Sequence, residues 1–234
     1  MAIKVEVIED LSTLYRRATR IIAEQLADGA KTFGLATGGT MLPLYENLRS
    51  SNCDFSQCTS FNLDEYVGLE KEHPESYLSF MNNRLFHAKP FKQSYLPDGE
   101  AEDVQAEAKR YEALLQKNTL DFQLLGVGEN GHIGFNEPGT PFSSETHVVM
   151  LTESTRRANA RFFNSIHEVP KLAITMGIST IMRAQCILLI AVGEKKRAAL
   201  EALISGEISE QIPVTCLQKH PNVKVLTDIQ LKGV

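Results

Sequence analysis

The stretch Gly126–Pro138, GVGENGHIGFNEP, follows the apolar run Phe122–Leu125, which we interpret as a buried strand. Its residues include four glycines, one histidine, two carboxylates and two asparagines. A core strand that ends in such a loop brings backbone close to a ligand and holds polar side chains beside it. The titratable groups around His132, which are Glu129 and Glu137, indicate acid–base chemistry.

Two other interpretations of this loop stay open on the residues alone. The loop could be a glycine-rich turn whose histidine caps a helix. Its glycines at 126, 128 and 131 also match G-x-G-x-x-G, the pattern of dinucleotide-binding turns. That pattern by itself is weakly specific, whereas the density of imidazole, carboxylate and amide groups is unusual, so we favour acid–base chemistry over a dinucleotide site.

The composition is that of an ordinary globular protein. At 234 residues, with 43% hydrophobic and 23% charged residues, the chain can bury a sizeable core, and we expect a single domain over residues 1–234. The net charge of −5 disfavours nucleic acid and anionic membranes as partners. An anionic ligand would therefore need a few local basic residues.

Neither the cysteines nor the first ten residues indicate a metal site or an export signal. Cys53, Cys58, Cys186 and Cys216 form no C-x-x-C pair and no Cys/His metal spacing, and Cys186 opens an apolar run, so it is expected in the core. MAIKVEVIED has no signal-peptide apolar region and is too short to span a bilayer. A reducing, cytoplasmic location is therefore expected.

Strands and helices are predicted to alternate along the chain. Apolar alternation and short apolar runs predict strands at residues 3–8, 32–36, 58–63, 122–125, 147–151, 172–176, 187–192 and 223–226. Helical spacing and capping residues predict helices at 11–26, 41–48, 76–86, 101–117, from 154 or 155 onward and at 193–204, with 90–99 as a connection. This alternation predicts an open, mostly parallel, Rossmann-like sheet in a three-layer α/β/α arrangement.

Four polar features each follow a predicted strand: the turn Thr37–Thr40, Asp64, the loop Gly126–Pro138 and the turn Gly193–Lys196. Ligands in parallel α/β sheets bind beyond the carboxyl ends of the strands, so we expect these features to converge. Each also has a structural explanation. The turn Thr37–Thr40 could be a tight turn that needs glycine, and Lys195 and Lys196 could be surface lysines. Asp64 and its neighbour Glu65 could cap a helix or lie in solvent.

The chain resembles the short bacterial glucosamine-6-phosphate deaminases of the glucosamine/galactosamine-6-phosphate isomerase family. The resemblance rests on TGGT at 37–40, FNLDEYVGL at 61–69, HPESYLSFM at 73–81, GHIGFNEP at 131–138, TRRANARFF at 155–163 and GEKK at 193–196. It implies isomerisation and deamination of glucosamine 6-phosphate with water, which yields fructose 6-phosphate and ammonia in amino sugar catabolism. It also implies that the reaction needs no metal or organic cofactor.

The resemblance implies roles for named residues. Asp64 would be the base that moves a proton from C2 to C1 of the open-chain sugar, and His132 would open the pyranose ring with Glu137 as its orienting partner. The residues implied in phosphate binding are Gly38, Gly39, Thr40, Arg161 and Lys196. Arginine offers a bidentate fork, and lysine offers a compact charge at a helix start.

The chain departs from the family pattern at two places. Many members carry an aspartate where this chain has Asn130, and an amide can orient His132 but stabilises its cation less well. Allosteric members carry basic residues where this chain has His147 and Val149. We therefore expect no activation by N-acetylglucosamine 6-phosphate, and a monomer or small homo-oligomer rather than a hexamer.

Two rival functions are a 6-phosphogluconolactonase-like hydrolase and a non-catalytic sugar-phosphate sensor. The segments FNEP and DEYVGL fit the deaminase and not the lactonase. A sensor needs no proton shuttle, so Asp64, His132 and Glu137 together argue against it. The polar segment 155–183, which carries Arg161, is expected to form a mobile lid over a small-molecule substrate.

Overall fold

The computed structural model describes residues 3–160 and 163–231. Within these residues seven strands form one sheet in the order β1-β10-β9-β6-β2-β3-β5. All neighbouring pairs in this sheet are parallel, which confirms the predicted fold class. Its strands are β1 (Ile3–Val7), β2 (Thr32–Leu35), β3 (Thr59–Asn62), β5 (Gln93–Tyr95), β6 (Phe122–Leu125), β9 (Cys186–Ala191) and β10 (Val223–Thr227).

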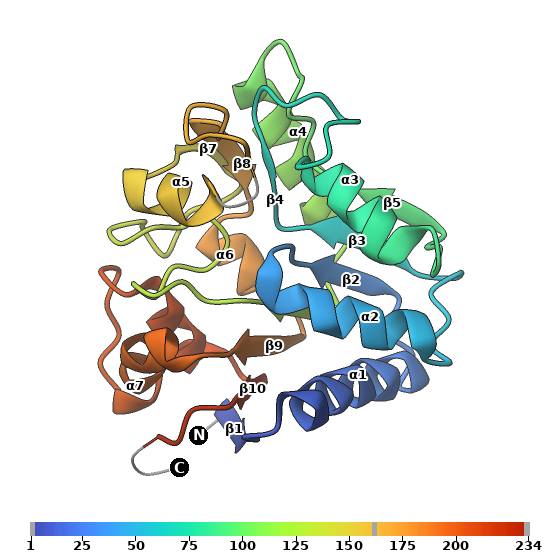
Figure 1. Ribbon diagram of the computed structural model, residues 1–234, viewed down its shortest axis with the longest axis vertical. Coiled ribbons are helices and arrows are strands. Elements are labelled where there is room, and N and C mark those ends of the chain that lie inside the picture. The colour runs from blue at the N-terminus through green and yellow to red at the C-terminus, as the bar shows by residue number, and fades with distance from the viewer. Residues whose placement is uncertain (1–2, 161–162, 232–234) are drawn as a thin grey trace.

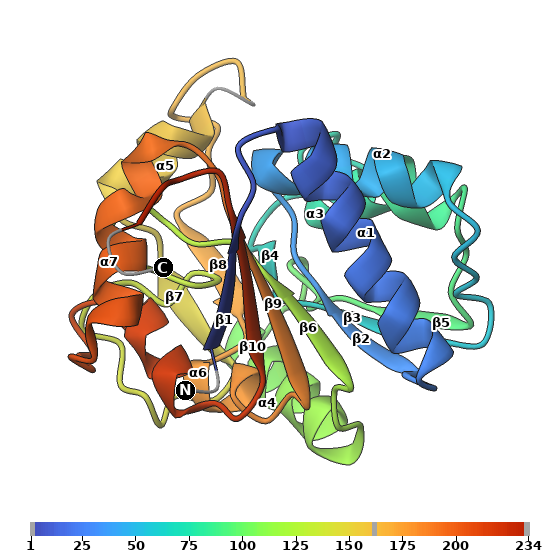
Figure 2. The ribbon, with the colours of Figure 1, turned by 90° about the horizontal axis from the view of Figure 1, so that it is seen from below.

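Helices cover both faces of this sheet. Figure 2 shows α1 and α2 on one side of the strands and α6 and α7 on the other. The α-helices are α1 (Leu11–Ala27), α2 (Leu42–Ser50), α3 (Tyr77–Met81), α4 (Val104–Lys117), α5 (Glu153–Asn159), α6 (Ile178–Ile181) and α7 (Arg197–Ser205). Shorter turns of helix are η1 (Gly39–Met41), η2 (Asn82–Phe86), η4 (Glu194–Lys196) and η5 (Pro213–Lys219).

Side-chain caps decide where several helices begin. Asp10 accepts a hydrogen bond from the Thr13 amide at 2.7 Å, as expected for the start of α1. Asp103 caps α4, so that helix starts three residues later than the predicted Ala101. The predicted helix 76–86 is capped by Ser76 but divides into α3 and the π-helical turn η2.

A second, antiparallel sheet contains β4 (Asp64–Tyr66), β8 (Leu172–Thr175) and β7 (His147–Met150), in that order. Figure 1 shows β7, β8 and α5 gathered at one end of the molecule, away from β1. The strands at 147–151 and 172–176 were predicted, but not this separate sheet. The prediction of a strand-free connection at 90–99 was wrong, because β5 lies there as a three-residue edge strand.

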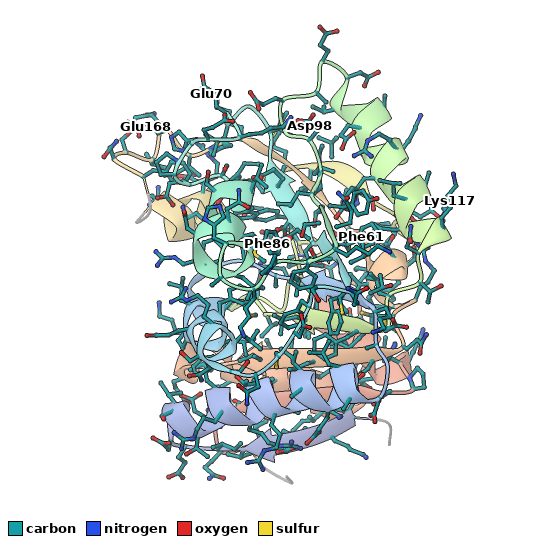
Figure 3. The ribbon with its side chains drawn as sticks, turned by 90° about the vertical axis from the view of Figure 1, so that its right-hand side faces the viewer. Phe61, Glu70, Phe86, Asp98, Lys117 and Glu168 are labelled. Atoms are coloured by element: carbon teal, nitrogen blue, oxygen red, sulfur yellow. The ribbon has the colours of Figure 1, made fainter. Side chains whose placement is uncertain are left out.

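Aromatic packing holds the β3 side of the sheet in place. The Phe61 ring of β3 is fully buried, stacks on Tyr95 at 4.9 Å between centroids and meets Tyr111 of α4 edge-on at 6.1 Å. Figure 3 shows Phe61 and Phe86 inside the molecule, with Lys117 at its outside. Because Phe61 lies three residues before Asp64, this packing fixes the point at which the chain leaves β3.

The sheet reverses its winding between β2 and β6. The chain moves outward from β2 to β3 and β5, whereas from β6 it moves in the opposite direction to β9 and β10. The adjacent strands β2, β6 and β9 therefore end at one edge, where a ligand crevice forms in such sheets. The turn after β2, the loop 126–138 after β6 and the turn after β9 all start at that edge.

Candidate active site

Two glycines give the loop 126–138 the shape that seats His132. A Cβ atom on Gly128 would lie 2.1 Å from Nδ1 and Cε1 of His132, so the ring occupies the space that a side chain at 128 would need. Gly134 has a φ of +57°, a left-handed conformation that favours glycine. The loop consequently folds back at Gly134 and returns Glu137 to His132.

His132, Asn130 and Glu137 form a hydrogen-bonded chain. The Nδ1 atom of His132 lies 2.7 Å from Oδ1 of Asn130, and Nδ2 of Asn130 donates to Oε2 of Glu137 at 2.8 Å. His132 Nδ1 also lies 3.6 Å from that carboxylate oxygen. Glu137 therefore orients His132 largely through Asn130, which stands between the two.

The hydrogen bonds that join His132, Asn130 and Glu137 have a fixed direction. An ionised carboxylate only accepts hydrogen bonds, so the amide NH₂ of Asn130 faces Glu137 and its carbonyl oxygen faces His132. Nδ1 of His132 must then carry the proton, which leaves Nε2 as the unprotonated nitrogen of the neutral ring. Burial lowers the pKa of His132 and Lys196 lowers it further, against the opposing charge of Glu137. A lowered pKa favours the neutral ring as a base near neutral pH.

Asp64 begins β4 and is only 6% exposed. Its Oδ2 atom lies 3.7 Å from the position of a Cβ on Gly134, which places the carboxyl beside the loop 126–138. Desolvation, together with the charge of Glu65, raises the pKa of Asp64 to about 8. None of the hydrogen bonds within residues 3–160 and 163–231 ends on this carboxyl, and its burial and raised pKa make it a candidate for proton transfer.

The neighbouring carboxylate, Glu65, has a structural role. It accepts hydrogen bonds from the backbone amides of Tyr77 and Leu78, both at 2.9 Å, at the start of α3. A third bond, at 2.8 Å, comes from the Tyr66 amide. The helix-capping explanation that the sequence left open for both carboxylates therefore holds for Glu65.

Two similar turns flank the loop. Gly38 after β2 and Gly193 after β9 have φ angles of +96° and +90°, and each precedes a short 3-10 turn that leads into a helix. The carbonyl of Gly38 accepts from the Met41 amide at 3.0 Å, and that of Gly193 accepts from the Lys196 amide at 2.9 Å. The first turn contains Gly38, Gly39 and Thr40, and backbone amides at such a helix start form an anion site.

The two lysines of the second turn have different surroundings. Lys195 pairs with Glu129 of the loop at 3.3 Å and is exposed, as the surface-lysine explanation predicts. Lys196 lies close enough to His132 to lower its pKa, so it belongs to the same edge. Arg161, the other predicted phosphate ligand, lies outside the described residues.

Sequence reasoning missed the contact between α5 and the candidate site. Its first turn contacts Glu137: the Thr155 hydroxyl donates to Oε1, and the Thr152 hydroxyl lies 3.3 Å from the same oxygen. The sequence analysis identified Thr155 as a possible helix start and as the first residue of a family motif and of the expected lid, and it did not identify Thr152. No spacing rule connects either threonine to a carboxylate fifteen or more positions earlier. The described residues thus unite Asp64, Asn130, His132 and Glu137 with both turns at one edge.

Two further findings concern metals and membranes. Within residues 3–160 and 163–231, no cluster of three or more His, Cys, Asp or Glu side chains could hold a metal ion. Cys186 is buried in the core, as predicted, and desolvation raises the pKa of its thiol. None of the described helices is long and apolar enough to cross a membrane.

Known proteins resemble the chain over most of its length. A glucosamine-6-phosphate deaminase of Lysinibacillus sphaericus is 63% identical over 207 residues, which cover 88% of this chain and 94% of that protein. One of Lactobacillus delbrueckii subsp. bulgaricus is 55% identical over 225 residues, 96% of each. The solved structure of a monomeric glucosamine-6-phosphate deaminase superposes with a TM-score of 0.91, at 44% identity over 97% of both chains.

More distant structures share the fold alone. A 6-phosphogluconolactonase from Leishmania guyanensis is 20% identical with a TM-score of 0.78, covering 97% of this chain and 96% of that one. The family model of glucosamine-6-phosphate isomerases/6-phosphogluconolactonase matches residues 8–226. The chain therefore belongs to the glucosamine-6-phosphate isomerase/6-phosphogluconolactonase family.

Proposed function

We propose that the chain is an enzyme that converts glucosamine 6-phosphate and water to fructose 6-phosphate and ammonia. The observation that carries this proposal is the convergence of two separate proton-transfer groups at one sheet edge. One is the desolvated carboxyl of Asp64, and the other is the chain from His132 through Asn130 to Glu137. Ring opening and proton transfer between carbons are distinct steps, and each needs its own acid–base group.

His132 performs the ring opening. Its Nε2 atom takes the proton of the anomeric hydroxyl, and a proton is returned to the ring oxygen as the C1–O5 bond breaks. The imidazolium that forms in between is stabilised by Asn130 and, at 3.6 Å from Nδ1, by Glu137. Because the pKa of the ring is lowered by burial, the neutral form needed to accept the first proton predominates near neutral pH.

Asp64 then moves a proton along the open chain. Its carboxylate takes the proton from C2 and returns it at C1, while a proton of the C2 ammonium group passes to the C1 oxygen, which leaves an alcohol at C1 and a protonated imine at C2. Water adds to that carbon, and ammonia leaves as the C2 carbonyl of fructose 6-phosphate forms. The substrate's own ammonium group, at C2, favours the ionised form of Asp64 on binding and so lowers the raised pKa of this carboxyl when the base is required.

The phosphate group is held at the two glycine turns. The backbone N–H groups of Gly38, Gly39 and Thr40 donate to it at the start of η1 and α2, and Lys196, the last residue of η4 and the N-cap of α7, supplies a positive charge. Arg161 completes this clamp in the proposal. In a chain of net charge −5, these local groups supply the attraction that the protein as a whole lacks.

The proposal also covers assembly, regulation and motion. We propose a monomer or small homo-oligomer in the cytoplasm, without activation by N-acetylglucosamine 6-phosphate; the 44%-identical relative is described as monomeric. We propose one domain, 1–234, with a lid within 155–183. Because β8 pairs with strands on both sides, closure concerns the part of that segment before Leu172. Unchanged hydrogen exchange there on adding a sugar-phosphate inhibitor would contradict the lid.

A substrate comparison tests the function. Purified protein is incubated with glucosamine 6-phosphate and, separately, with 6-phosphogluconolactone, and ammonia, fructose 6-phosphate and released acid are quantified. The proposal predicts equimolar ammonia and fructose 6-phosphate, with hyperbolic kinetics that N-acetylglucosamine 6-phosphate leaves unchanged. Hydrolysis of the lactone alone would establish the hydrolase, and binding of sugar phosphates without turnover of either compound would establish the sensor.

A further inference from the structure

The first turn of α5 is joined to the His132 chain through Glu137. Thr155 is 8% exposed, and its hydroxyl donates to Oε1 of Glu137. The Thr152 hydroxyl lies 3.0 Å from that of Thr155 and caps the helix by accepting from the Thr155 amide at 3.2 Å. Since Asn130 donates to the other carboxylate oxygen, Oε2, the two ends of the Glu137 carboxylate are held from opposite sides.

This double attachment fixes the rotation of the carboxylate. With Oε1 on Thr155, Oε2 accepts from the Asn130 NH₂. Together with the His132 backbone N–H, which donates to Oδ1 of Asn130 at 3.2 Å, it determines that the amide carbonyl faces His132. Without the Thr155 hydroxyl, Oε1 retains the longer contact with the Thr152 hydroxyl at 3.3 Å, and the carboxylate can turn about its last bond, which weakens one of the two hydrogen bonds that orient the Asn130 amide. A reversed amide would present NH₂ to Nδ1 of His132 and place the ring proton on Nε2 instead.

We propose that Thr155 is a positioning residue for ring opening. Its hydroxyl acts through Glu137 and Asn130 to hold His132 with its proton on Nδ1. The kinetic part of this inference rests on the proposed function, whereas the position of the ring proton is a property of the protein alone. The same contact makes the acid–base state of His132 depend on the docking of α5. That docking is supported by Asn159, whose amide donates to the Tyr66 hydroxyl of β4 at 2.9 Å.

Thr180 offers a matched control within this protein for the loss of a buried threonine hydroxyl. Thr180 of α6 is 2% exposed and donates to the buried carboxylate of Glu112 at 2.8 Å. Glu112 also accepts from Thr146 and Arg183, and it has no contact with the His132 chain. Thr180→Val therefore removes a comparable threonine–carboxylate bond that has no connection to the ring proton.

The ring proton is read by ¹⁵N NMR of protein labelled at its six histidines, with the His132 signals identified by their loss in His132→Gln. The wild type at pH 8 is expected to show a protonated Nδ1 and an unprotonated Nε2 at His132. In Thr155→Val these signals should move toward the other tautomer, whereas Thr155→Ser and Thr180→Val should keep the wild-type pattern.

Kinetics with glucosamine 6-phosphate provide the second measurement. Thr155→Val should lower kcat roughly ten- to a hundredfold, the range for losing one hydrogen bond to a charged group, with little change in KM. Thr155→Ser should restore most of the turnover, and Thr180→Val should lower thermal stability without this loss of kcat.

A wild-type His132 that carries its proton on Nε2 would overturn the inference, even if Thr155→Val failed to fold. So would a folded Thr155→Val protein with wild-type His132 signals and turnover, or a Thr155→Ser protein as impaired as the valine variant. If the wild type released no ammonia, the proposed function would fail, while the NMR comparison would still decide the part of Thr155.

Discussion

Asp64→Asn should make the protein more stable in a pH-dependent way while it removes the proposed base. The carboxyl has a pKa of about 8 in the folded protein, against an ordinary value of 3.8. When the pKa of an acid is higher in the folded state than in the unfolded state, the free energy of unfolding falls as the pH rises from the unfolded-state pKa to the folded-state pKa. The wild type therefore carries a penalty that grows between about pH 4 and pH 8, and the amide variant does not.

The magnitude follows from the linkage relation. Each pH unit in that window costs the folded wild type about 1.4 kcal/mol, so the penalty grows by about 3 kcal/mol between pH 5 and pH 7. The amide has its own cost in a buried site where no described residue donates a hydrogen bond to the Asp64 carboxyl, but that cost is the same at both pH values. The change in the stability difference between pH 5 and pH 7 therefore isolates the carboxyl.

Denaturant unfolding of both proteins at pH 5, 6 and 7 measures this quantity. The difference in the free energy of unfolding between Asp64→Asn and the wild type should increase by about 3 kcal/mol across the series, in favour of the variant. The variant should also have lost its turnover. Glu65→Gln is the matched neighbour: the pKa of Glu65 rises only to about 6, so its pH-dependent change should be smaller and end near pH 6. An advantage of Asp64→Asn that is constant with pH would refute the desolvated base.

Three further substitutions test other parts of the site. Gly128→Ala should lower turnover by about a hundredfold or more, because its Cβ would lie 2.1 Å from the His132 ring; steady-state kinetics near wild-type values would contradict that packing. Lys196→Ala should mainly raise KM for glucosamine 6-phosphate, since phosphate binding is shared by ground and transition states; a collapse of kcat at constant KM would count against the phosphate assignment. Asn130→Asp should raise the pKa of His132 above its lowered value by placing a carboxyl 2.7 Å from Nδ1; an NMR titration shows the shift, and a pKa that stayed or fell would reject the relay.

The parallel core could be predicted because its strands are short, buried and bounded by capping or turn residues. Phe122–Leu125 is buried at every position and ends in the glycine loop, so both periodicity and composition identified it. The small antiparallel sheet gave no such signal. Its β4 has only three residues and follows β3 after a single residue, so Asp64 was expected at a strand's end rather than at the start of another strand.

The sequence predicted only those parts of the candidate site that follow directly after a parallel strand. Residues that follow strands, such as Asp64 and the loop 126–138, meet because parallel strands end at one edge. The contact between Thr155 and Glu137 depends instead on how α5 packs, which no local pattern encodes. In the same way, Asn130 was expected beside His132, but its place between His132 and Glu137 follows from the turn at Gly134.

The most direct test of the proton-transfer role of Asp64 is isotope exchange at C2 of glucosamine 6-phosphate. The wild type and Asp64→Asn are incubated with substrate in D₂O, and deuterium at C2 of the recovered substrate and at C1 of fructose 6-phosphate is measured alongside substrate binding. We predict deuterium incorporation by the wild type and none by the variant, which still binds the sugar phosphate. Full exchange by Asp64→Asn would show that another group is the base.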